Sequence, residues 1–448
     1  MQNTGLYWFT NDLRLEDNLA LAQTAARVNQ MLCVYVVDPA WFTPNRYGQK
    51  SMGNCRWRFL QQTLVDLTQA LEAFGQQLLI IHESPLDAIA KLITQYDIRA
   101  LFRSQNAGFY ENQLWQTLQC RYRSINFEEL ATHTLFSIHA LPFSLADFPD
   151  TFSKFRKRVE PLVNNVVISS LTHLPPPPKE TRWSTISRLP LARESGDSLL
   201  FIGGAIRAKS HLLGYFSTLL PSTYKKVRNA LDGWDNSTKF SPWLANGSIS
   251  VKQILSALQY YEHDVKANES TYWIQFELLW REYFQWLAHA HKAKLFTRSG
   301  IRQQKVLTTF YPERFQRWCQ GNTPSPIVNA CMNQLNITGY MSNRGRQIVA
   351  SYFVNELNLD WRYGAAYFEQ QLIDYDVAVN WGNWQYLAGV GADPRGRRWF
   401  DMDKQTRRYD PDKSFIIKWC GEVQDESLDS VDAADWPMIK SDSTVIKE

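Results

Sequence analysis

The sequence predicts an α/β N-terminal domain with a doubly wound parallel sheet, joined by a long connector to an all-α domain. Up to about residue 130, short apolar runs alternate with helical patterns, which is typical of parallel βαβ units. Residues 131–195 are rich in Pro, Ser and Thr and show no sustained period, whereas helical spacing dominates from 196. We therefore expect domains at 1–130 and 196–423, a connector at 131–195 and an acidic, disordered tail at 424–448.

The first domain is predicted from apolar runs rich in β-branched and aromatic residues. We expect strands over 5–10, 31–37, 77–81 and 98–103. Trp57, Leu60 and Leu64 begin a spacing of three and four that predicts a helix over 54–74, and a second helix is expected over 86–96. This domain should end near 127–130.

The connector and the second domain follow from composition and helical spacing. We expect the connector to lie over the surface, with the proline run 175–178 as a stiff polyproline segment. In the second domain, the spacing of apolar residues predicts helices over 249–262, 270–292, 325–336, 343–357 and 364–373.

Charge and composition narrow the class of protein. The net charge is +4, but residues 422–448 hold eight acids against two lysines, a net of −6, so the rest of the chain carries +10. A basic body suits a polyanionic partner. No apolar run is long enough to span a membrane, the first residues lack a secretory signal, and the six cysteines form no C-x-x-C pair. We expect a cytoplasmic protein with reduced cysteines and no metal site.

A first cluster of polar and aromatic side chains falls in 273–284. In a helix there, Glu277, Trp280, Arg281 and Phe284 share one face. A carboxylate, an indole and a guanidinium side by side are costly to bury without partners. They form either a salt bridge beside a core tryptophan or the floor of a pocket that stacks a flat ring and hydrogen-bonds its edge.

Two further segments suit a charged, planar ligand or an internal polar network. Asn343, Arg346 and Gln347 share a face of the helix that opens within 339–351. The segment 372–386 is expected to hold its polar residues in a loop between helices; these are Asp374, Asp376 and Asn380.

The segment 236–244 is rich in hydroxyl groups. Ser237, Thr238, Lys239 and Ser241 come directly before Pro242 and a helix. Hydroxyls and free amides at that place form either an ordinary helix cap or a cradle for phosphate.

Taken together, these segments resemble the FAD-binding domain of photolyases and cryptochromes, in the same order and at similar intervals. WFTNDLRLEDN near the N-terminus resembles the opening strand, turn and helix of that family, and the likeness covers roughly residues 5–420. GYMSNRGRQIV, LIDYDVAVNWGNW and AGVGADPRGRRWFDMDKQTRRYDPDKSFI resemble the DASH branch.

The resemblance implies roles for the residues that match the family's motifs. It implies FAD binding by Tyr224, Thr238, Lys239, Phe240, Ser241, Arg281, Asn343, Arg346, Asp374, Asp376 and Asn380, the last facing flavin N5. It implies a cavity for a flipped lesion at Glu277, Trp280, Gln347 and Tyr386. Nearby arginines supply phosphate contacts or form a solvated surface loop; these are Arg395, Arg397, Arg398, Arg407 and Arg408. Trp384 and Trp361 would be the first steps of an electron chain, and Glu111 and Phe296 would hold a 5,10-methenyltetrahydrofolate antenna.

The implied function is that of a deoxyribodipyrimidine photo-lyase of the DASH type. Such an enzyme repairs cyclobutane pyrimidine dimers under blue light by electron transfer from excited reduced FAD, with Asn380 and Glu277 as catalytic residues beside the two tryptophans. We expect DNA as the partner, preferentially single-stranded and carrying a dimer, RNA as a second nucleic acid, and a monomer.

Two departures from the family pattern bear on this interpretation. Thr308 stands where a third tryptophan of the electron chain is expected, so Phe310, Tyr311 or another aromatic residue would have to replace it. Tyr386 stands where ordinary dimer photolyases have a tryptophan, which predicts a weaker grip on a flipped lesion.

Three alternatives remain at this point. A blue-light sensor that binds nucleic acid or a protein without repair would use the same pocket. Repair of six-four photoproducts uses cavity histidines, and neither 339–351 nor 372–386 contains one. A nucleotide-binding protein unrelated to light, built on the first domain, would leave the C-terminal segments unexplained.

Overall fold

The computed structural model describes residues 4–163, 166–179, 201–393, 396 and 398–423. The predicted tail at 424–448, part of the connector and the two arginines at 395 and 397 lie outside the described residues. Among the residues that are described, no helix is both long and apolar enough to cross a membrane.

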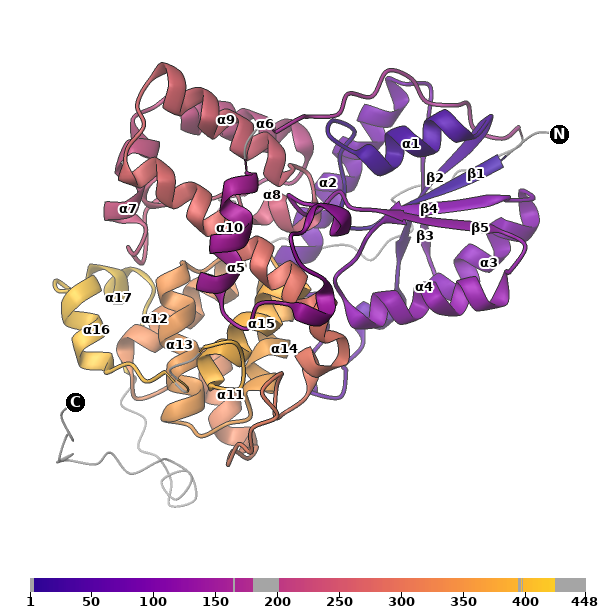
Figure 1. Cartoon of the computed structure of the whole chain (residues 1–448). Coiled ribbons are helices and arrows are strands. Elements are labelled where there is room, and N and C mark those ends of the chain that lie inside the picture. The colour runs from indigo at the N-terminus through magenta and orange to yellow at the C-terminus, as the bar shows by residue number, and fades with distance from the viewer. Residues whose placement is uncertain (1–3, 164–165, 180–200, 394–395, 397, 424–448) are drawn as a thin grey trace.

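The N-terminal domain is a five-stranded, wholly parallel sheet in the order β3-β2-β1-β4-β5. Its strands are β1 (Thr4–Phe9), β2 (Gln30–Val37), β3 (Leu78–His82), β4 (Ala100–Ser104) and β5 (Asn126–Leu130). Successive residues of β1 point to opposite faces of the sheet and pack in two different hydrophobic cores. Tyr7 packs with α1 (Leu19–Arg27) and α2 (Asn54–Glu72), and Leu6 with α3 (Pro85–Gln95) and α4 (Phe109–Arg121). Helices on both faces confirm the doubly wound prediction (Figure 1).

The connector contributes a buried helix to the core of the helical domain, which corrects the expectation that it lies over the surface. Helix α5 (Phe152–Val159) buries Phe152, Phe155 and Val159 against the helical domain. Farther along, the carbonyl oxygens of Pro175 and Pro176 accept hydrogen bonds from the side chain of Gln76 and the backbone N–H of Met31.

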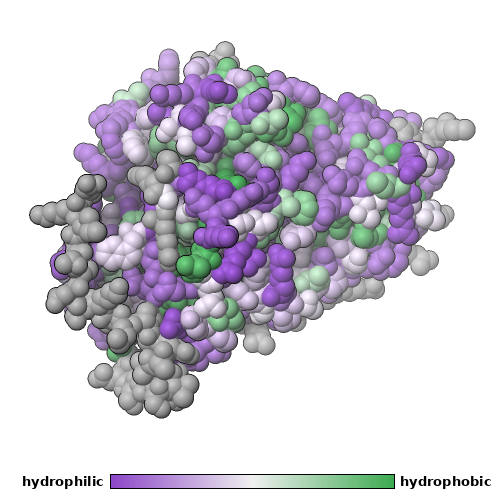
Figure 2. Space-filling model, turned by 60° about the horizontal axis from the view of Figure 1, so that its bottom comes forward, coloured by the Kyte–Doolittle hydropathy of each residue, from purple (hydrophilic) through white to green (hydrophobic). Residues whose placement is uncertain are grey.

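The second domain is helical, as predicted. Its helices are α6 (Ala205–Phe216), α7 (Tyr224–Val227), α8 (Ser241–Asn246), α9 (Val251–Asp264), α10 (Glu269–His291), α11 (Pro312–Gln320), α12 (Pro326–Thr338), α13 (Asn343–Asn355), α14 (Trp361–Gln371), α15 (Val377–Ala388), α16 (Met402–Tyr409) and α17 (Ser414–Lys418). Helix α10 crosses the middle of the domain (Figure 1) and packs against α5, α7, α9 and α15. The apolar residues are gathered inside, and the face seen in Figure 2 is largely hydrophilic.

Buried polar contacts join the two domains. Arg14 is 2 % exposed and donates to the carbonyl oxygens of Gly247 at 2.9 Å and Thr132 at 2.8 Å. Gly247 has φ +76°, and a Cβ there would clash with the backbone of Asn11, so only glycine fits. This junction holds the start of the connector against the helical domain.

Candidate functional site

One pocket of about 550 Å³ lies in the helical domain, within the size range of small-molecule sites. Helix α10 supplies one wall, because Glu277, Trp280, Arg281 and Phe284 all face the pocket as their spacing predicts. Glu277 forms an ion pair with Arg228, which also lines the pocket. Burial raises the pKa of Glu277, and Arg228 opposes this shift.

The hydroxyl-rich segment before α8 forms a second wall. Lys239 is 7 % exposed and sits in the left-handed region at φ 55°. Its Nζ lies 3.4 Å from the hydroxyl of Tyr340 and has no carboxylate partner among the residues that the structure describes. A buried lysine is rare unless paired, so this wall, with the neighbouring Ser237 and Thr238, fits an anion such as a phosphate.

The third wall comes from α13 and the start of α15. Arg346 donates through Nη2 to both carboxylate oxygens of Asp374, at 3.0 and 2.7 Å. Asp376 caps α15 by accepting from the backbone N–H groups of Ala378 and Val379. The prediction of a loop holds for Asp374 and Asp376 but was wrong for Asn380, which lies inside α15 and donates to the carbonyl oxygen of Ala365 at 3.0 Å.

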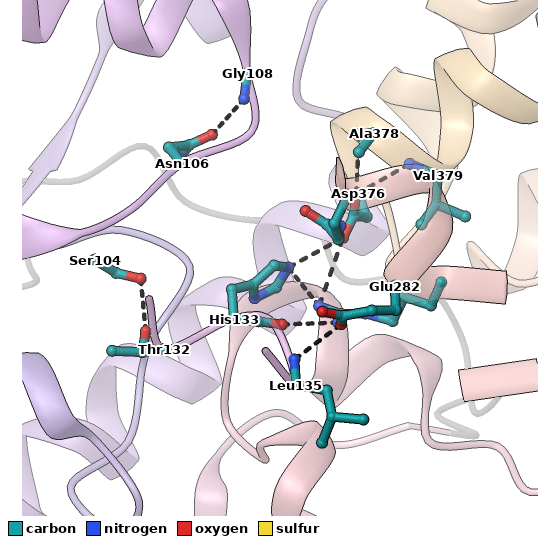
Figure 3. A network of polar contacts seen from close by, with 12 residues as sticks. Ser104, Asn106, Gly108, Thr132, His133, Leu135, Glu282, Asp376, Ala378 and Val379 are labelled. Carbon is teal, nitrogen blue, oxygen red and sulfur yellow. Dashed lines mark hydrogen bonds and ion pairs between the residues drawn. The ribbon is translucent and has the colours of Figure 1, made fainter. Parts of the chain in front are cut away.

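A network from the connector holds this third wall in place (Figure 3). His133 Nε2 lies 3.0 Å from Asp376 Oδ2 and 2.6 Å from Arg281 Nη2. Gln285 donates to the same Asp376 oxygen at 2.6 Å. Glu282, fully buried on α10, accepts from the backbone N–H of Leu135 at 2.8 Å. Connector, α10 and α15 are thereby locked to one another.

Burial, hydrogen bonding and nearby charges together determine the pKa values of Asp376 and His133. Desolvation alone would raise the pKa of Asp376, but hydrogen bonding to His133 and the charges of His133 and Arg281 bring it to about 2. Desolvation, followed by the charge of Arg281, lowers the pKa of His133. Asp376 is therefore an anion at neutral pH.

Aromatic rings form the mouth of the pocket. Trp280 stacks on Phe152 of α5, with ring centroids 3.8 Å apart and an angle of 12°, and meets Tyr386 edge-on at 5.9 Å. Tyr386 accepts a hydrogen bond from Arg398, whose guanidinium also pairs with Asp393. One face of Trp280 is thus covered by the protein.

Trp384 lies at the inner end of the pocket and is 2 % exposed. Its Nε1 has no hydrogen-bond partner within the described part of the chain. The ring contacts α14 at Gly364, where a Cβ would clash with it, and Trp361 is buried one turn away on the same helix.

The structure brings most of the predicted site residues into this pocket. Its lining includes Tyr224, Thr238, Lys239, Phe240, Ser241, Glu277, Trp280, Arg281, Asn343, Arg346, Gln347, Asp374, Asp376, Asn380, Trp384, Tyr386 and Arg398. Trp361 lies behind the pocket, whereas Arg407 and Arg408 lie on α16 outside its lining. Arg395 and Arg397 are outside the described residues.

The two predicted antenna residues lie at another place, where the domains meet. Glu111 is exposed on α4, and the ring of its neighbour Tyr110 packs on Phe296 at 5.3 Å. Phe296 in turn packs on Trp381 of α15 at 4.9 Å.

Sequence reasoning missed three residues that shape the pocket. Arg228 pairs with Glu277, His133 orients Asp376, and Phe152 covers Trp280. The spacing of Phe152, Phe155 and Val159 is helical and could have revealed α5. No local signal marks His133, because its partners are far away in the chain.

The arrangement suits an anionic cofactor with a flat ring. The Lys239 segment fits phosphate, the Arg346–Asp374 pair offers charge beside a ring, and Asn380 places a neutral carboxamide between them. FAD has these chemical parts, so the residues present fit it.

Comparisons with known proteins agree with this site. The model of the FAD binding domain of DNA photolyase matches residues 273–446, and the DNA photolyase model matches residues 5–179. Cryptochrome DASH of Idiomarina loihiensis is 53% identical over 97% of this chain and 96% of its own length. Cryptochrome DASH of Vibrio parahaemolyticus is 47% identical over 97% of each chain.

Solved structures show the same architecture. The crystal structure of the Synechocystis sp. PCC6803 cryptochrome superposes with a TM-score of 0.88 at 34% identity, covering 97% of this chain and 95% of that one. A class III photolyase from Agrobacterium tumefaciens shares the fold, with a TM-score of 0.81 at 23% identity over 94% of this chain and 86% of that one. The chain belongs to the photolyase/cryptochrome family, in its cryptochrome DASH branch, and carries that family's FAD-binding domain.

Proposed function

We propose that the protein repairs cyclobutane pyrimidine dimers in single-stranded DNA under blue light. One observation carries this proposal: a single pocket joins the anion-binding Lys239 segment and the Arg346–Asp374 pair to an open mouth lined by Glu277, Trp280 and Tyr386. The inner part suits a bound flavin nucleotide, and the mouth leaves room for a pyrimidine pair beside it.

The chain's own residues would hold FAD by charge and hydrogen bonding. Thr238, Lys239 and Ser241, with Tyr224 and Phe240, would hold the phosphates and ribityl chain, and Arg346 and Asp374 would lie beside the ring. When bound and reduced, FAD supplies upon blue-light absorption the electron that splits a cyclobutane ring. Asn380 donates or accepts a hydrogen bond at the ring edge without adding a negative charge.

The mouth would bind the dimer by stacking and hydrogen bonding. Trp280 and Tyr386 supply aromatic surface, and Glu277 and Gln347 contact the polar edges of the pyrimidines. The carboxylate of Glu277, held by Arg228, can accept a hydrogen bond from a pyrimidine N–H. Arg398 places a positive charge at the mouth, where a DNA phosphate would pass.

The preference for single strands follows from energy. Flipping a dimer out of a duplex costs a few kcal/mol, whereas an unpaired strand avoids most of that cost. Stacking returns about 1–3 kcal/mol per base. Phe152 and Phe284 both stack on Trp280, with ring centroids 3.8 and 5.7 Å away, and the phenol of Tyr386 is smaller than an indole. The pocket is therefore poorly equipped to offset unpairing.

Two tryptophans would carry electrons toward the pocket during activation. Trp384 touches the pocket, and Trp361 lies one turn of α14 away from the contact between Trp384 and Gly364. A folate antenna, 5,10-methenyltetrahydrofolate, would lie between Glu111 and Phe296 at the domain junction, where aromatic rings gather. A near-ultraviolet absorption band that disappears in Phe296→Ala, with the FAD bands unchanged, would support this second site.

The test is light-dependent repair of a thymine dimer in a single-stranded oligonucleotide. Purified protein with bound FAD should restore undamaged thymines under blue light and do nothing in the dark. Trp280→Ala should weaken binding of the dimer while FAD stays bound. Absence of repair by a fully reduced, FAD-loaded protein would contradict the proposal.

A second candidate is a blue-light sensor that binds nucleic acid or a partner without repair. The observation that favours it is the mouth itself: Arg228 already neutralises Glu277, and Phe152 covers half of Trp280. Light-dependent binding of undamaged single strands, without any change in a dimer, would identify the sensor.

A further inference from the structure

A histidine of α6 lies behind the Lys239 segment. His211 is half-buried, and its Nε2 lies 2.9 Å from the backbone carbonyl oxygen of Thr238. Because a carbonyl oxygen can only accept a hydrogen bond, Nε2 of His211 carries the hydrogen. Thr238 and Lys239 both line the pocket, whereas His211 lies outside that lining. The imidazole therefore contacts the segment from the side that faces away from the pocket.

Aromatic rings on several sides fix the orientation of this imidazole. The ring of Trp243 stacks on it, with centroids 5.2 Å apart and an angle of 30°. Phe240 and Trp234 meet it edge-on, at 5.2 and 5.3 Å. Trp243 is itself held, because its Nε1 donates to the carbonyl oxygen of Ile202 at 2.9 Å. The packing thus keeps Nε2 of His211 directed at Thr238.

The hydrogen bond from His211 determines the direction of one peptide group in the pocket wall. The peptide bond between Thr238 and Lys239 is trans, so its C=O and N–H point in opposite directions. With the carbonyl directed at His211, the N–H of Lys239 points to the pocket side, where Ser237 Oγ lies 3.4 Å away. Neither Thr238 nor Lys239 forms a backbone–backbone hydrogen bond within the described part of the chain. The bond to His211 therefore holds this peptide group in place.

The backbone that follows has a conformation that binds anions. Lys239 has φ 55°, in the left-handed region, and Phe240 has φ −76° and ψ −15°, in the right-handed region. Such an alternation turns successive backbone N–H groups toward one point and forms an anion-binding concavity. A positive φ is disfavoured for a residue with a Cβ and persists only where surrounding contacts maintain it. The hydrogen bond from His211 to the adjoining peptide is one of these contacts.

We propose that His211 is a positioning residue for the phosphates of the cofactor. Its Nε2–H holds the Thr238 carbonyl away from the pocket and so keeps the N–H groups of the Lys239 segment directed at the anion. The imidazole acts through the peptide group between Thr238 and Lys239 and does not touch the cofactor. This inference rests on the placement of the FAD phosphates at this segment, which is part of the proposed function.

Two substitutions separate the hydrogen bond from the ring packing. Gln carries an N–H donor as many bonds from Cα as Nε2 of histidine, but it has no ring. Phe keeps a flat ring against Trp243 but has no donor. Burial lowers the pKa of His211, and the charge of Lys239 acts in the same direction, against the hydrogen bond to Thr238. At about pH 8 the imidazole is therefore neutral, and neither substitution changes the charge of the protein.

The experiment uses full-length, FAD-loaded protein at about pH 8. Phosphorus NMR of the bound diphosphate reports on the anion site, and flavin fluorescence after dilution gives the rate of FAD release. His211→Phe should shift the phosphorus resonances and speed release roughly fivefold, the effect of one lost hydrogen bond. His211→Leu, which also lacks a donor, should do the same. His211→Gln should stay near the wild type in both measurements.

His291→Phe is the matched control. His291 is also a half-buried histidine of the helical domain, at the end of α10, and its ring meets Phe148 edge-on. It lies outside the pocket lining. Its replacement should leave the phosphorus resonances and the release of FAD as in the wild type.

The outcomes separate this inference from the proposed function. His211→Gln as impaired as His211→Phe would assign the role to ring packing and overturn the proposal. So would wild-type behaviour of His211→Phe in a preparation where Lys239→Met shifts the resonances and speeds release. If neither His211→Phe nor Lys239→Met changes either measurement, the phosphates do not lie at this segment, and that part of the proposed function is contradicted as well.

Discussion

Lys239 is a buried cation that faces hydroxyl groups and no carboxylate within the described residues. Such a group destabilises the empty protein, because its desolvation is not offset by a counter-charge. A bound phosphate reverses this balance. The same residue therefore has opposite effects on the stability of the empty and the FAD-loaded protein.

Lys239→Met tests this directly. The variant should weaken FAD by roughly 2 kcal/mol, about thirtyfold in Kd, because a hydrogen bond to a charged group is lost. The FAD-free variant should unfold at a higher temperature than FAD-free wild type. Thermal unfolding with and without FAD measures both effects, and Lys226→Met, at an exposed lysine, is the control. A lower melting temperature of the FAD-free variant would contradict the account.

Trp384 offers a second test at the residue scale. Trp384→Phe should keep FAD bound, since phenylalanine fills most of the space and the indole Nε1 has no partner to lose among the described residues. Photoreduction of FAD, followed by absorption under blue light, should be abolished or greatly slowed. Trp115→Phe is the matched control, because Trp115 is also buried with an unpartnered Nε1 but lies in the N-terminal domain. Normal photoreduction in Trp384→Phe would place the electron path elsewhere.

At the scale of elements, helices α9, α10, α12, α13 and α14 were predicted to within a few residues, whereas α5, α11, α15 and α16 were not. Helix α10 was expected over 270–292 and spans Glu269–His291, with its polar face placed correctly. Helix α15 is covered on nearly all sides, so its apolar residues surround it instead of forming one stripe, and the segment was predicted as a loop. Asp374 and Asp376 were still placed correctly outside a helix, because both precede α15.

Contacts between distant segments could not be predicted at all. His133 reaches Asp376 across 243 positions of the chain, and Phe152 reaches Trp280 from a different element. Local spacing carries no information about such pairs. The residue types of the site followed from the family resemblance, but its support from the connector required the structure.

Helix α5 should control the mouth of the pocket. Phe152→Leu keeps the apolar volume but removes an aromatic stack worth about 0.5–1.5 kcal/mol. Trp280 then loses its fixed orientation, and affinity for dimer-containing single strands should fall several-fold with FAD still bound. Fluorescence anisotropy of a labelled oligonucleotide measures this. Phe143→Leu, which packs on Phe155 and not on Trp280, should change affinity little. Equal losses in both variants would refute a specific role for Phe152.

At the scale of the whole molecule, half-buried histidines link stability to pH. Desolvation lowers the pKa of His289 to about 4, with the charges of His133 and Lys292 acting in the same direction. An unfolded histidine titrates near pH ~6.5. Between these two pH values His289 is protonated in the unfolded chain but not in the folded protein. Lowering the pH therefore favours unfolding.

His289→Gln should reduce this acid sensitivity. As the pH falls from 7 to 4, the wild type should lose on the order of 3 kcal/mol more unfolding free energy than the variant, from a shift of roughly two units. Urea unfolding at several pH values measures the difference. His139→Gln, at an exposed histidine, should follow the wild type. Parallel pH profiles for wild type and His289→Gln would contradict the assignment.

The preference for single-stranded DNA depends on the pocket, on the connector that packs against its mouth, and on the energy needed to open the DNA. Trp280 is already stacked on Phe152 and Phe284, and Tyr386 is a phenol, so stacking at the mouth compensates little of the energy needed to open a duplex. A deficit of only ~1.4 kcal/mol already lowers binding tenfold. Tyr386→Trp enlarges the stacking surface and should raise activity on duplex more than on single strands.

The most direct test of the central claim is the ratio of two repair rates in the wild type. Thymine-dimer repair is measured under blue light, with dark controls, on an oligonucleotide alone and annealed to its complement. The account predicts a rate at least ~tenfold higher on the single strand when substrate is below saturation. Equal rates on the two substrates would contradict the single-strand preference, and no repair of either would leave the sensor as the function.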